Sequence, residues 1–577
     1  MARTSIAVVF AGSGGSGAMT AGAVFLRAAA HAGYYGMMTQ LFGAQVRGGE
    51  SASLVQVSTA PIETQPDCYD LFVALDWEMV EQFAAEIPLD DRSIILADPA
   101  EGPVPAGIAK SKGRVVALAM NDPTENKLAR ALRGKRVNMF AAGCVCALTG
   151  IGDGDAKAAI DTIFDGKGAD LIAANAAGAT LGAQAAPALA LDLWLEPPRK
   201  AARWLINGNQ AVAFGALRGG VRFVGCYPIT PATDLVEWLA PHLIKLGGRL
   251  VLGEDELASV NMTLGASYGG TPAMTVTSGP GFSLMIETLG LAVAAEIPFV
   301  LVDVMRAGPS TGIASKTEQS DINLAIYGGH GDAPRIVLAP VSVADCVNTG
   351  EYAVYVAESL QTPVIVLSDQ ALGQATTVID PSSDRPAPLK RRVNGVAPGK
   401  PFKRYATGGD PVTPMPLPGT PQLEWVAEGL THNEAGLPAS GAAAHVAQIE
   451  KRAKKFRQFD PGEHWGEVWG EGDVAIIAIG STIGPAREAA KRLTASGQKV
   501  RVIALRVLSP LPMAALGRAL DGVRRIVVIE QNHGAQLYHY LLGHKAIPPG
   551  AESIARPGPS PFPRRRSPVM WCDGEIL

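Results

Sequence analysis

Short runs of apolar residues alternate with amphipathic stretches of helical spacing along most of this 577-residue chain. Apolar runs bounded by turn signals favour buried strands, and the stretches between them favour the helices that connect parallel strands. The sequence therefore predicts an α/β protein with several doubly wound, mostly parallel sheet domains. The clearest strand candidates are Ile6–Phe10, Leu71–Leu75, Val115–Ala119, Leu250–Leu252, Met274–Val276, Pro298–Val302, Val474–Gly480, Val500–Leu505 and Ile526–Ile529.

The alternation is interrupted at points that suggest domain boundaries. Residues 1–195 and 200–375 each carry the strand–helix pattern, and a third such unit covers 471–548. Between the second and third units, residues 376–470 are crowded with Pro and Gly and then carry a basic helical run, which we interpret as a connector that wraps the fold. The tail, 549–577, is rich in Pro and Arg, so we expect an extended arm there.

Composition narrows the class of protein. Hydrophobic residues make up 47% of the chain and charged residues 18%, which is ordinary for a globular protein with a buried core. The formal net charge of -4 does not suggest nucleic acid as a partner. The N-terminus lacks the apolar region of a signal peptide, and the longest uncharged stretch, 171–191, is mostly Ala and Gly rather than a membrane span. We expect a cytoplasmic protein with no membrane association.

The six cysteines do not form a recognisable metal or cluster site. No Cys-x-x-Cys pair occurs, and Cys144 with Cys146 alone cannot supply the four ligands that zinc or an iron–sulfur cluster needs. We interpret the cysteines as small buried side chains in a reducing compartment and predict no metal ligands in this chain.

The most informative segment is Tyr227–Pro231, which reads Tyr-Pro-Ile-Thr-Pro. It follows an apolar strand candidate at 221–226 and precedes a stretch, 232–243, with helical spacing of its apolar residues. Pro231 suits a first helical position, and Thr230 then stands at the N-cap. A hydroxyl beside the free N–H groups of a helix start can bind a small anion such as a carboxylate. A capped strand–helix turn without a ligand would give the same pattern.

Tyr227–Pro231 resembles the signature of 2-oxoacid:ferredoxin oxidoreductase alpha subunits, and the resemblance covers nearly the whole chain. Residues 1–195 resemble the gamma domain of these enzymes, here fused ahead of the alpha part. Residues 200–375 are similar to the pyrimidine-binding domain of thiamine enzymes, and 471–548 to the transketolase C-terminal domain. The fused order is most similar to the 2-oxoglutarate enzymes. Further matching strings are Gly12–Gly17, Gln45–Ser51, Gly429–Gly436 and Glu530–Gly534.

The resemblance implies a chemistry and a set of partners. Enzymes of this family use thiamine diphosphate and coenzyme A (CoA) to convert a 2-oxoacid to an acyl-CoA and CO₂ and pass electrons to ferredoxin, or they run the reverse carboxylation. This chain would hold the pyrimidine side of the cofactor, whereas a beta subunit would hold its diphosphate, Mg²⁺ and a [4Fe–4S] cluster. The expected reaction converts 2-oxoglutarate to succinyl-CoA, in a dimer of alpha–beta heterodimers.

The resemblance assigns the acid–base role to Glu256. Thiamine enzymes place one carboxyl group against the aminopyrimidine ring, where it exchanges a proton with a ring nitrogen. Spacing to Gly265 makes Glu256 the equivalent residue, and Glu254 is the alternative. An acid in the first turn of a helix also offsets the helix dipole without any catalytic role.

The substrate would be bound by residues at the ends of two strands. Arg306 ends a strand candidate, where ligands of α/β sheets usually bind, and its guanidinium can pair with a carboxylate. The resemblance assigns Arg306, Thr230 and Tyr227 to the 2-oxoacid. Lys316 could meet the distal carboxylate of a dicarboxylic substrate. The alternative for Arg306 is that it tethers the nearby Glu318 loop.

A glycine-rich turn near the N-terminus matches the dinucleotide fingerprint, with Gly12, Gly14 and Gly17 between a strand and a helix. No Asp or Glu precedes Glu50, so the acid that would hold a ribose is missing and NAD binding is not expected. Gly14, Gly15 and Gly17 could instead bind a CoA phosphate. Arg47 could add a cation for CoA or substrate, or could be an ordinary surface residue.

Two rival functions follow from the same residues. A self-contained thiamine enzyme of the transketolase type would need its own diphosphate motif, which only Asp153 in Gly152–Gly154 could begin; we interpret that match as accidental. A non-catalytic scaffold that binds CoA or a nucleotide would leave Tyr227–Pro231 and the Arg306 loop with merely structural roles.

Overall fold

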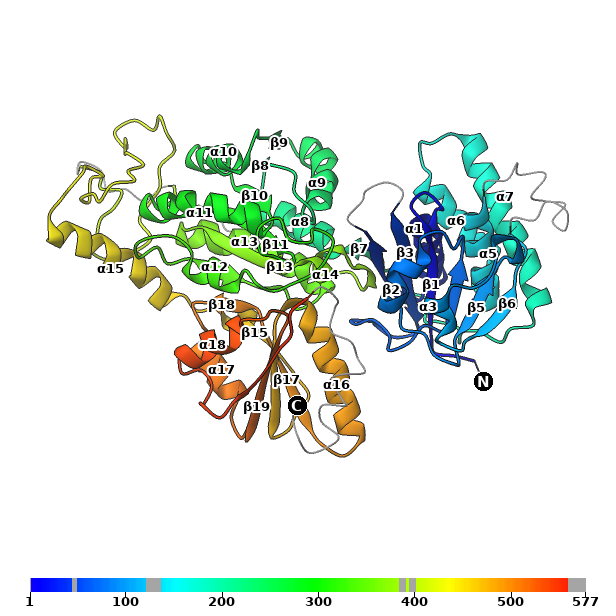
Figure 1. Ribbon diagram of the computed structural model, residues 1–577. Coiled ribbons are helices and arrows are strands. Elements are labelled where there is room, and N and C mark those ends of the chain that lie inside the picture. The colour runs from blue at the N-terminus through cyan, green and yellow to red at the C-terminus, as the bar shows by residue number, and fades with distance from the viewer. Residues whose placement is uncertain (1, 44–48, 121–135, 383–390, 394–400, 559–577) are drawn as a thin grey trace. The chain divides into compact units, whose positions relative to one another are not determined.

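The computed structural model describes residues 2–43, 49–120, 136–382, 391–393 and 401–558, which fall into two units (Figure 1). The first unit runs to Asn207 and also includes a short later segment, Gln374–Pro381. The second begins at Gly208, runs to Gly373 and resumes at Ser382.

The first unit is built on an eight-stranded sheet in the order β6-β5-β4-β1-β3-β2-β14-β7. Strands β1, β4, β5 and β6 are parallel, whereas the pairs from β1 to β7 by way of β3, β2 and β14 are antiparallel. This half-antiparallel sheet departs from the simple parallel alternation that the strand runs suggest. The strands are β1 (Ser5–Ser13), β2 (Tyr35–Phe42), β3 (Glu50–Ser58), β4 (Leu71–Ala74), β5 (Ile94–Ala97), β6 (Arg114–Ala117), β7 (Trp204–Asn207) and β14 (Thr376–Ile379).

Helices cover both faces of this sheet, which explains why β1 reads as a continuous apolar run. On one face, Val8 and Phe10 of β1 pack with the four longer helices. On the other, Val9 and Phe72 pack with the two short ones. The helices are α1 (Ala18–Ala32), α2 (Val80–Phe83), α3 (Ala106–Ala109), α5 (Val137–Thr149), α6 (Asp153–Ile163) and α7 (Ala169–Ala185).

The second unit contains a seven-stranded sheet in the order β18-β12-β13-β11-β10-β8-β9. All neighbouring pairs are parallel except β12 with β18, which is antiparallel. The strands are β8 (Phe223–Cys226), β9 (Arg249–Leu252), β10 (Ala273–Thr277), β11 (Val300–Met305), β12 (Ile336–Leu338), β13 (Val364–Asp369) and β18 (Val507–Ser509).

Helices connect the parallel strands of this sheet and pack against it. The sheet core includes Val260 of α10, Phe282 of α11 and Ile322 of α12. Two N-caps are visible: Asp255 accepts the Ala258 N–H at 2.7 Å to start α10, and Ser342 accepts the Asp345 N–H at 3.1 Å to start α13. The helices are α8 (Gly208–Gly219), α9 (Thr233–Lys245), α10 (Glu256–Tyr268), α11 (Gly279–Ala294), α12 (Ile322–Tyr327), α13 (Val343–Leu360) and α14 (Gln370–Gln374).

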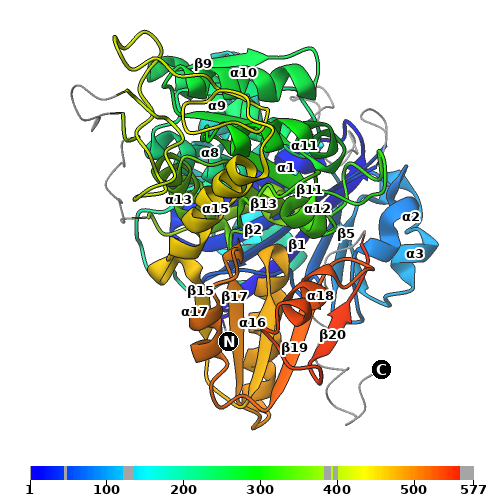
Figure 2. The ribbon, with the colours of Figure 1, turned by 90° about the vertical axis from the view of Figure 1, so that its left-hand side faces the viewer.

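A five-stranded sheet completes the second unit, in the order β15-β17-β16-β19-β20, and Figure 2 shows its strands side by side. Only β15 is antiparallel to its neighbour. Residues 552–555, which lie inside the expected C-terminal arm, form its edge strand. The elements are β15 (Gly466–Trp469), β16 (Val474–Ala478), β17 (Val500–Leu505), β19 (Arg525–Glu530) and β20 (Glu552–Ala555), with α16 (Ile483–Ala495), α17 (Met513–Ala519) and α18 (Gln536–Gly543).

The connector before this sheet is fixed to the core by buried charges. Its helix α15 (Ala442–Gln458) directs Lys451 and Lys455 onto Glu296, which follows α11, with Nζ to carboxylate oxygen distances of 2.5 and 2.6 Å. Arg404, which is fully buried, donates to the Glu296 carbonyl at 2.7 Å. The basic helical run of the connector therefore points partly inward, because these two lysines have a buried acid to pair with.

No helix among the described residues is long and apolar enough to cross a bilayer. The predicted α/β class with several mostly parallel sheets is confirmed.

Candidate active site

Four neighbouring strands of the seven-stranded sheet end at the same edge, and the segments that follow them carry most of the residues singled out from the sequence. Because the strands are parallel neighbours, their carboxyl ends line one edge, which is where α/β sheets bind ligands. The segments are Tyr227–Thr230 after β8, Glu256 after β9, Gly279–Gly281 after β10 and Arg306 after β11.

The Tyr227–Pro231 segment forms an exposed turn rather than a helix start. The Ala232 N–H donates to the Ile229 carbonyl at 2.8 Å, and α9 begins only at Thr233. The prediction that Thr230 is an N-cap and Pro231 a first helical residue is therefore wrong by two residues, because a separate turn stands between the strand and the helix. Thr230 itself is exposed at the sheet edge, as a ligand-binding hydroxyl has to be.

Arg306 joins two of these segments. Its guanidinium donates to the Thr230 carbonyl at 2.5 Å and to the Thr311 carbonyl at 2.8 Å, and the side chain is buried. Its Nε is also buried and has no hydrogen-bond partner among the described residues. Burial lowers the pKa of the guanidinium, and Asp321 opposes that shift. Arg306 thus remains a cation with an unused hydrogen-bond donor next to Thr230.

Glu256 is the first residue of α10 and lies against the start of α11. The side chain is 8% exposed, and a Cβ built on Gly281 would be 2.6 Å from its Oε1. Within the described part of the chain, its carboxylate has no hydrogen-bond partner. A largely buried carboxyl group without a partner is unusual for a residue that only offsets a helix dipole. The geometry suits a group that meets a ligand.

Sequence reasoning missed a pair of buried carboxyl groups close to Arg306. Asp303 on β11 is fully buried, and its two carboxylate oxygens have no hydrogen-bond partner among the described residues; its carboxyl group interacts electrostatically with that of Asp321, which precedes α12. Burial, and then the Asp321 carboxyl, raise the pKa of Asp303 well above its ordinary value. Burial and Glu318 raise the pKa of Asp321 to about 6, although Arg306 acts in the opposite direction. The pair therefore retains a proton. The single acid in the apolar run Val300–Met305 was the signal available.

The loop after Arg306 is held by the C-terminal sheet. Gln319 donates to Asp369 at 3.0 Å and to the Ile479 carbonyl at 2.9 Å, and its own N–H donates to the Gln531 carbonyl at 2.7 Å. Asn532 donates to the Gln319 carbonyl at 3.0 Å. The loop after Arg306 is therefore bonded to Glu530–Gly534, one of the strings that carry the family resemblance. Lys316 lies in this loop, half-buried.

In the first unit, the glycine-rich turn forms as predicted between β1 and α1. Gly15 and Gly17 have φ of 110° and 87°, which only glycine adopts readily, and Gly14 N–H donates to the Gly49 carbonyl at 2.7 Å. The Asp76 carboxylate accepts the Ser13 N–H at 2.8 Å, so an acid already uses part of the turn. The Ser16 hydroxyl, by contrast, is buried and unpartnered within the described residues.

The remaining residues from the sequence fall elsewhere. Arg47 lies outside the described residues. Asp153 starts α6, where it accepts the Thr180 hydroxyl at 3.0 Å and pairs with Lys157 at 2.7 Å. Among the described cysteines, burial raises the pKa of Cys226, which ends β8, to about 12, so its thiol stays protonated.

Family models match three segments of the chain. Residues 7–185 match the pyruvate ferredoxin/flavodoxin oxidoreductase model, and residues 214–451 match the thiamine diphosphate-binding model of pyruvate flavodoxin/ferredoxin oxidoreductase. Residues 472–542 match core domain II of pyruvate:ferredoxin oxidoreductase.

Individual relatives agree with these models. The chain is 38% identical over 347 residues to the 2-oxoglutarate oxidoreductase subunit KorA of Mycobacterium tuberculosis, which is 59% of this chain and 52% of that one. It is 37% identical over 331 residues to the 2-oxoglutarate synthase subunit KorA of Archaeoglobus fulgidus, or 57% of this chain and 88% of that one. The match to the former therefore spans about half of that relative's length.

A solved structure resembles the entire fold. The 2-oxoglutarate:ferredoxin oxidoreductase from Magnetococcus marinus, with 2-oxoglutarate, coenzyme A and succinyl-CoA bound, is 34% identical and superposes with a TM-score of 0.87, and the match covers 100% of both chains. The fold and the family models define an oxidoreductase with a thiamine diphosphate-binding domain at residues 214–451. The chain belongs to the 2-oxoacid:ferredoxin oxidoreductase family.

Proposed function

We propose that this chain is the fused gamma–alpha subunit of an enzyme that converts 2-oxoglutarate, CoA and oxidised ferredoxin to succinyl-CoA, CO₂ and reduced ferredoxin. The observation that carries the proposal is the arrangement at the sheet edge, where the buried Arg306 bonds to Thr230, which follows β8, and the unpartnered Glu256 follows the neighbouring strand β9. The reverse carboxylation would use the same groups.

In this proposal, Arg306 and Thr230 bind the carboxylate and keto oxygen of the substrate. A bidentate guanidinium–carboxylate contact fixes the orientation of a 2-oxoacid as well as its affinity. Tyr227 is 40% exposed beside them and would cover the bound acid. Lys316, in the loop that begins at Arg306, is the proposed partner of the distal carboxylate that distinguishes 2-oxoglutarate from pyruvate.

Glu256 fits the cofactor's pyrimidine ring because the residue is only 8% exposed and its carboxylate has no protein partner among the described residues. When bound, thiamine diphosphate supplies the carbon nucleophile for decarboxylation. The role of Glu256 would be to hold and return a proton at a ring nitrogen. Glu254, the alternative, is two residues away and precedes the helix.

We assign the diphosphate site with Mg²⁺ and the [4Fe–4S] cluster to a separate beta subunit. The carboxylate of Asp153, which a self-contained enzyme would need, is already engaged by Thr180 and Lys157. Ferredoxin would then receive electrons from the beta subunit. The proposed assembly is a cytoplasmic dimer of alpha–beta heterodimers.

The CoA phosphates are assigned to the first unit. Gly14, Gly15 and Gly17 present a turn at the start of α1, and the unpartnered Ser16 hydroxyl could donate to a phosphate oxygen. Arg47 is the proposed additional cation.

Purification of the native complex tests which subunit carries the Mg²⁺ and the cluster. Iron, sulfide and Mg²⁺ should follow a second polypeptide, and removal of that polypeptide should leave this chain colourless and inactive. Stoichiometric cluster iron on this chain alone would overturn the assignment.

Exchange of the C2 proton of bound thiamine diphosphate tests the site itself. Glu256→Gln is nearly isosteric but cannot cycle a carboxyl proton, so exchange in the assembled complex should slow by about 10²–10⁴-fold. Glu254→Gln is the matched control and should exchange normally. The reverse pattern would move the acid–base role to Glu254, and normal exchange in both variants would remove it from this segment.

A further inference from the structure

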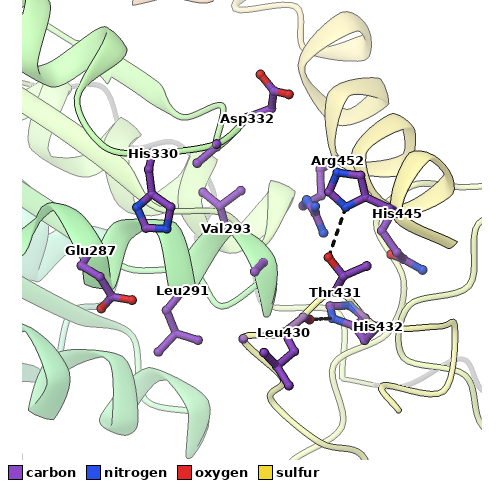
Figure 3. Close-up of a pocket in the computed structure, with 16 residues that line it drawn as sticks. Glu287, Leu291, Val293, His330, Asp332, Leu430, Thr431, His432, His445 and Arg452 are labelled. Carbon is purple, nitrogen blue, oxygen red and sulfur yellow. Dashed lines mark hydrogen bonds between the residues drawn. The ribbon is translucent and has the colours of Figure 1, made fainter. Parts of the chain in front are cut away.

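A second cavity lies away from the sheet edge, and the proposed reaction does not use it. It has a volume of about 270 Å³ and lies between the outer face of α11, the 330–333 loop, the 429–432 segment and α15 (Figure 3). We call it the outer pocket. Glu287, the lining residue of α11 nearest to Gly281, is six residues along the helix from it, which is roughly 9 Å. The outer pocket is therefore separate from the Glu256 site.

The wall formed by α15 and the 429–432 segment carries polar groups that lack partners. Arg452 is half-buried, and its buried Nε makes no hydrogen bond to any described residue. His432 is 1% exposed; its Nδ1 lies 2.9 Å from the Leu430 carbonyl and its Nε2 is buried and unpartnered. The Oε1 of the buried Gln448 is also unpartnered, while its amide nitrogen donates to Tyr405.

These unpartnered groups determine which hydrogen-bond donors and acceptors a ligand must carry. Nδ1 of His432 must carry the proton to bond a carbonyl, so Nε2 is an acceptor, like Gln448 Oε1. Burial lowers the pKa of His432, which keeps the ring in this neutral form. Two buried acceptors require a donor, whereas the guanidinium of Arg452 requires an acceptor, best an anionic one.

The opposite wall is acidic. Glu287 on α11 and Asp332 on the neighbouring loop both line the outer pocket, and neither has an ion-pair partner within the described residues. Figure 3 shows Glu287 and His330 on one side of the space and Arg452 and His445 on the other. The two walls thus differ in charge across a cavity slightly smaller than the roughly 300–1,000 Å³ of drug-sized sites.

We propose that the outer pocket binds a small zwitterion, a molecule of amino-acid type that carries both a carboxylate and an ammonium group. The carboxylate would accept hydrogen bonds from Arg452. The ammonium group would lie across the cavity, toward Glu287 and Asp332. The Gly429–Gly436 string, which the proposed reaction leaves without a role, contributes His432 and Thr431 to this site.

Titration of the full-length chain by ligand-observed NMR tests the proposal. The probes are glycine, β-alanine and γ-aminobutyrate, which differ in charge separation, with acetate and ethylammonium as singly charged comparisons. At least one amino acid should bind tenfold or more tightly than either comparison. If acetate or ethylammonium binds as tightly as every amino acid, or if no amino acid binds, the proposal is wrong.

Variants locate the binding. Arg452→Gln and Glu287→Gln should each weaken the amino acid by about tenfold to a hundredfold, the usual effect of losing a charge-assisted contact. Glu287 is exposed, so its variant stays informative if Arg452→Gln fails to fold. Arg457→Gln, on the same helix but in an exposed ion pair with Glu450, is the matched control and should bind normally. Unchanged affinity in Glu287→Gln would overturn the proposal. None of these measurements depends on turnover.

Discussion

Replacement of Glu296 by Gln should release helix α15 from the second unit. Glu296 is 1% exposed and is surrounded by three buried cations: Lys451 and Lys455 at 2.5 and 2.6 Å, and Arg404 at 3.9 Å. Burial alone would raise the pKa of this carboxyl group, but the coulombic attraction of Lys455, Lys451 and Arg404 prevails and holds it well below its ordinary value. The Glu296 carboxylate is therefore the anion on which the whole cluster depends.

The expected loss follows from the charges left behind. Removing one partner of a buried ion pair typically costs about 3–5 kcal/mol, because the other charge stays buried without compensation. Part of this free-energy cost does not arise here. Burial already lowers the pKa of Lys455 to about 7, so this lysine can lose its proton at little cost in free energy when Glu296 is replaced. We therefore expect a loss near the lower limit, about 3 kcal/mol at neutral pH.

The pH dependence of Glu296→Gln has a definite sign. Above a folded-state pKa of about 7 and below the ordinary 10.5, the unfolded chain binds more protons at Lys455 than the folded one. The value of about 7 already includes the attraction of Glu296, so in the variant Lys455 loses its proton at a lower pH. The deficit of the variant should therefore shrink as the pH rises toward 7 and stay constant above it.

Native-state hydrogen exchange of the α15 amides is the suitable assay, because a chain with several sheets does not unfold in one step. The control is Glu450→Gln on α15 itself, whose ion pair with Arg457 is about 60% exposed on both sides and should be worth less than about 1 kcal/mol. If both variants lower the protection of α15 equally, the Glu296 cluster does not hold the helix and the reasoning is refuted.

Three further changes test the candidate active site. Arg306→Ala should lower kcat/KM for 2-oxoglutarate by about tenfold to a hundredfold in steady-state kinetics; unchanged kinetics would exclude it from the site. Gly281→Ala would place a Cβ 2.6 Å from Glu256 Oε1 and should slow C2-proton exchange of bound thiamine diphosphate, with circular dichroism unchanged. The pKa of Asp321 is raised to about 6, so the folded chain binds more protons than the unfolded one and its stability should fall from pH 4 to 6. Asp303→Asn should make this fall with pH shallower in urea titrations. An identical pH slope in the variant would contradict the shared proton.

The sequence allows the strands and their order along the chain to be predicted because buried parallel strands leave a local signal. Val474–Gly480 and Val500–Leu505 are examples, and they form β16 and β17 within two residues of the expected ends. The pairing of β14 with β7 and β2 is not local: residues 376–379 return to a sheet whose other strands end at Asn207. Such contacts depend on long-range packing that no periodicity in the sequence records.

The residues of the candidate site likewise fall into those that the sequence allowed us to predict and those that it did not. Arg306 and Glu256 could be selected because strand ends and helix starts are recognisable, and the family strings gave their roles. The Asp303–Asp321 pair could not, because Asp303 is a single acid in an apolar run and its partner is 18 residues away. The protonation of such a pair arises from burial and mutual repulsion, which depend on the folded structure.

The contacts of Arg306 explain how one residue can serve both the fold and a ligand. Its hydrogen bonds go to two backbone carbonyls, of Thr230 and Thr311, which orient the guanidinium without neutralising it. A carboxylate partner in the same position would have cancelled the charge that a 2-oxoacid has to meet. Carbonyl groups also do not titrate, so the orientation of Arg306 does not depend on pH. Because guanidinium has five N–H donors, two such bonds and an unpartnered Nε leave donors for an anion at the exposed Thr230 turn.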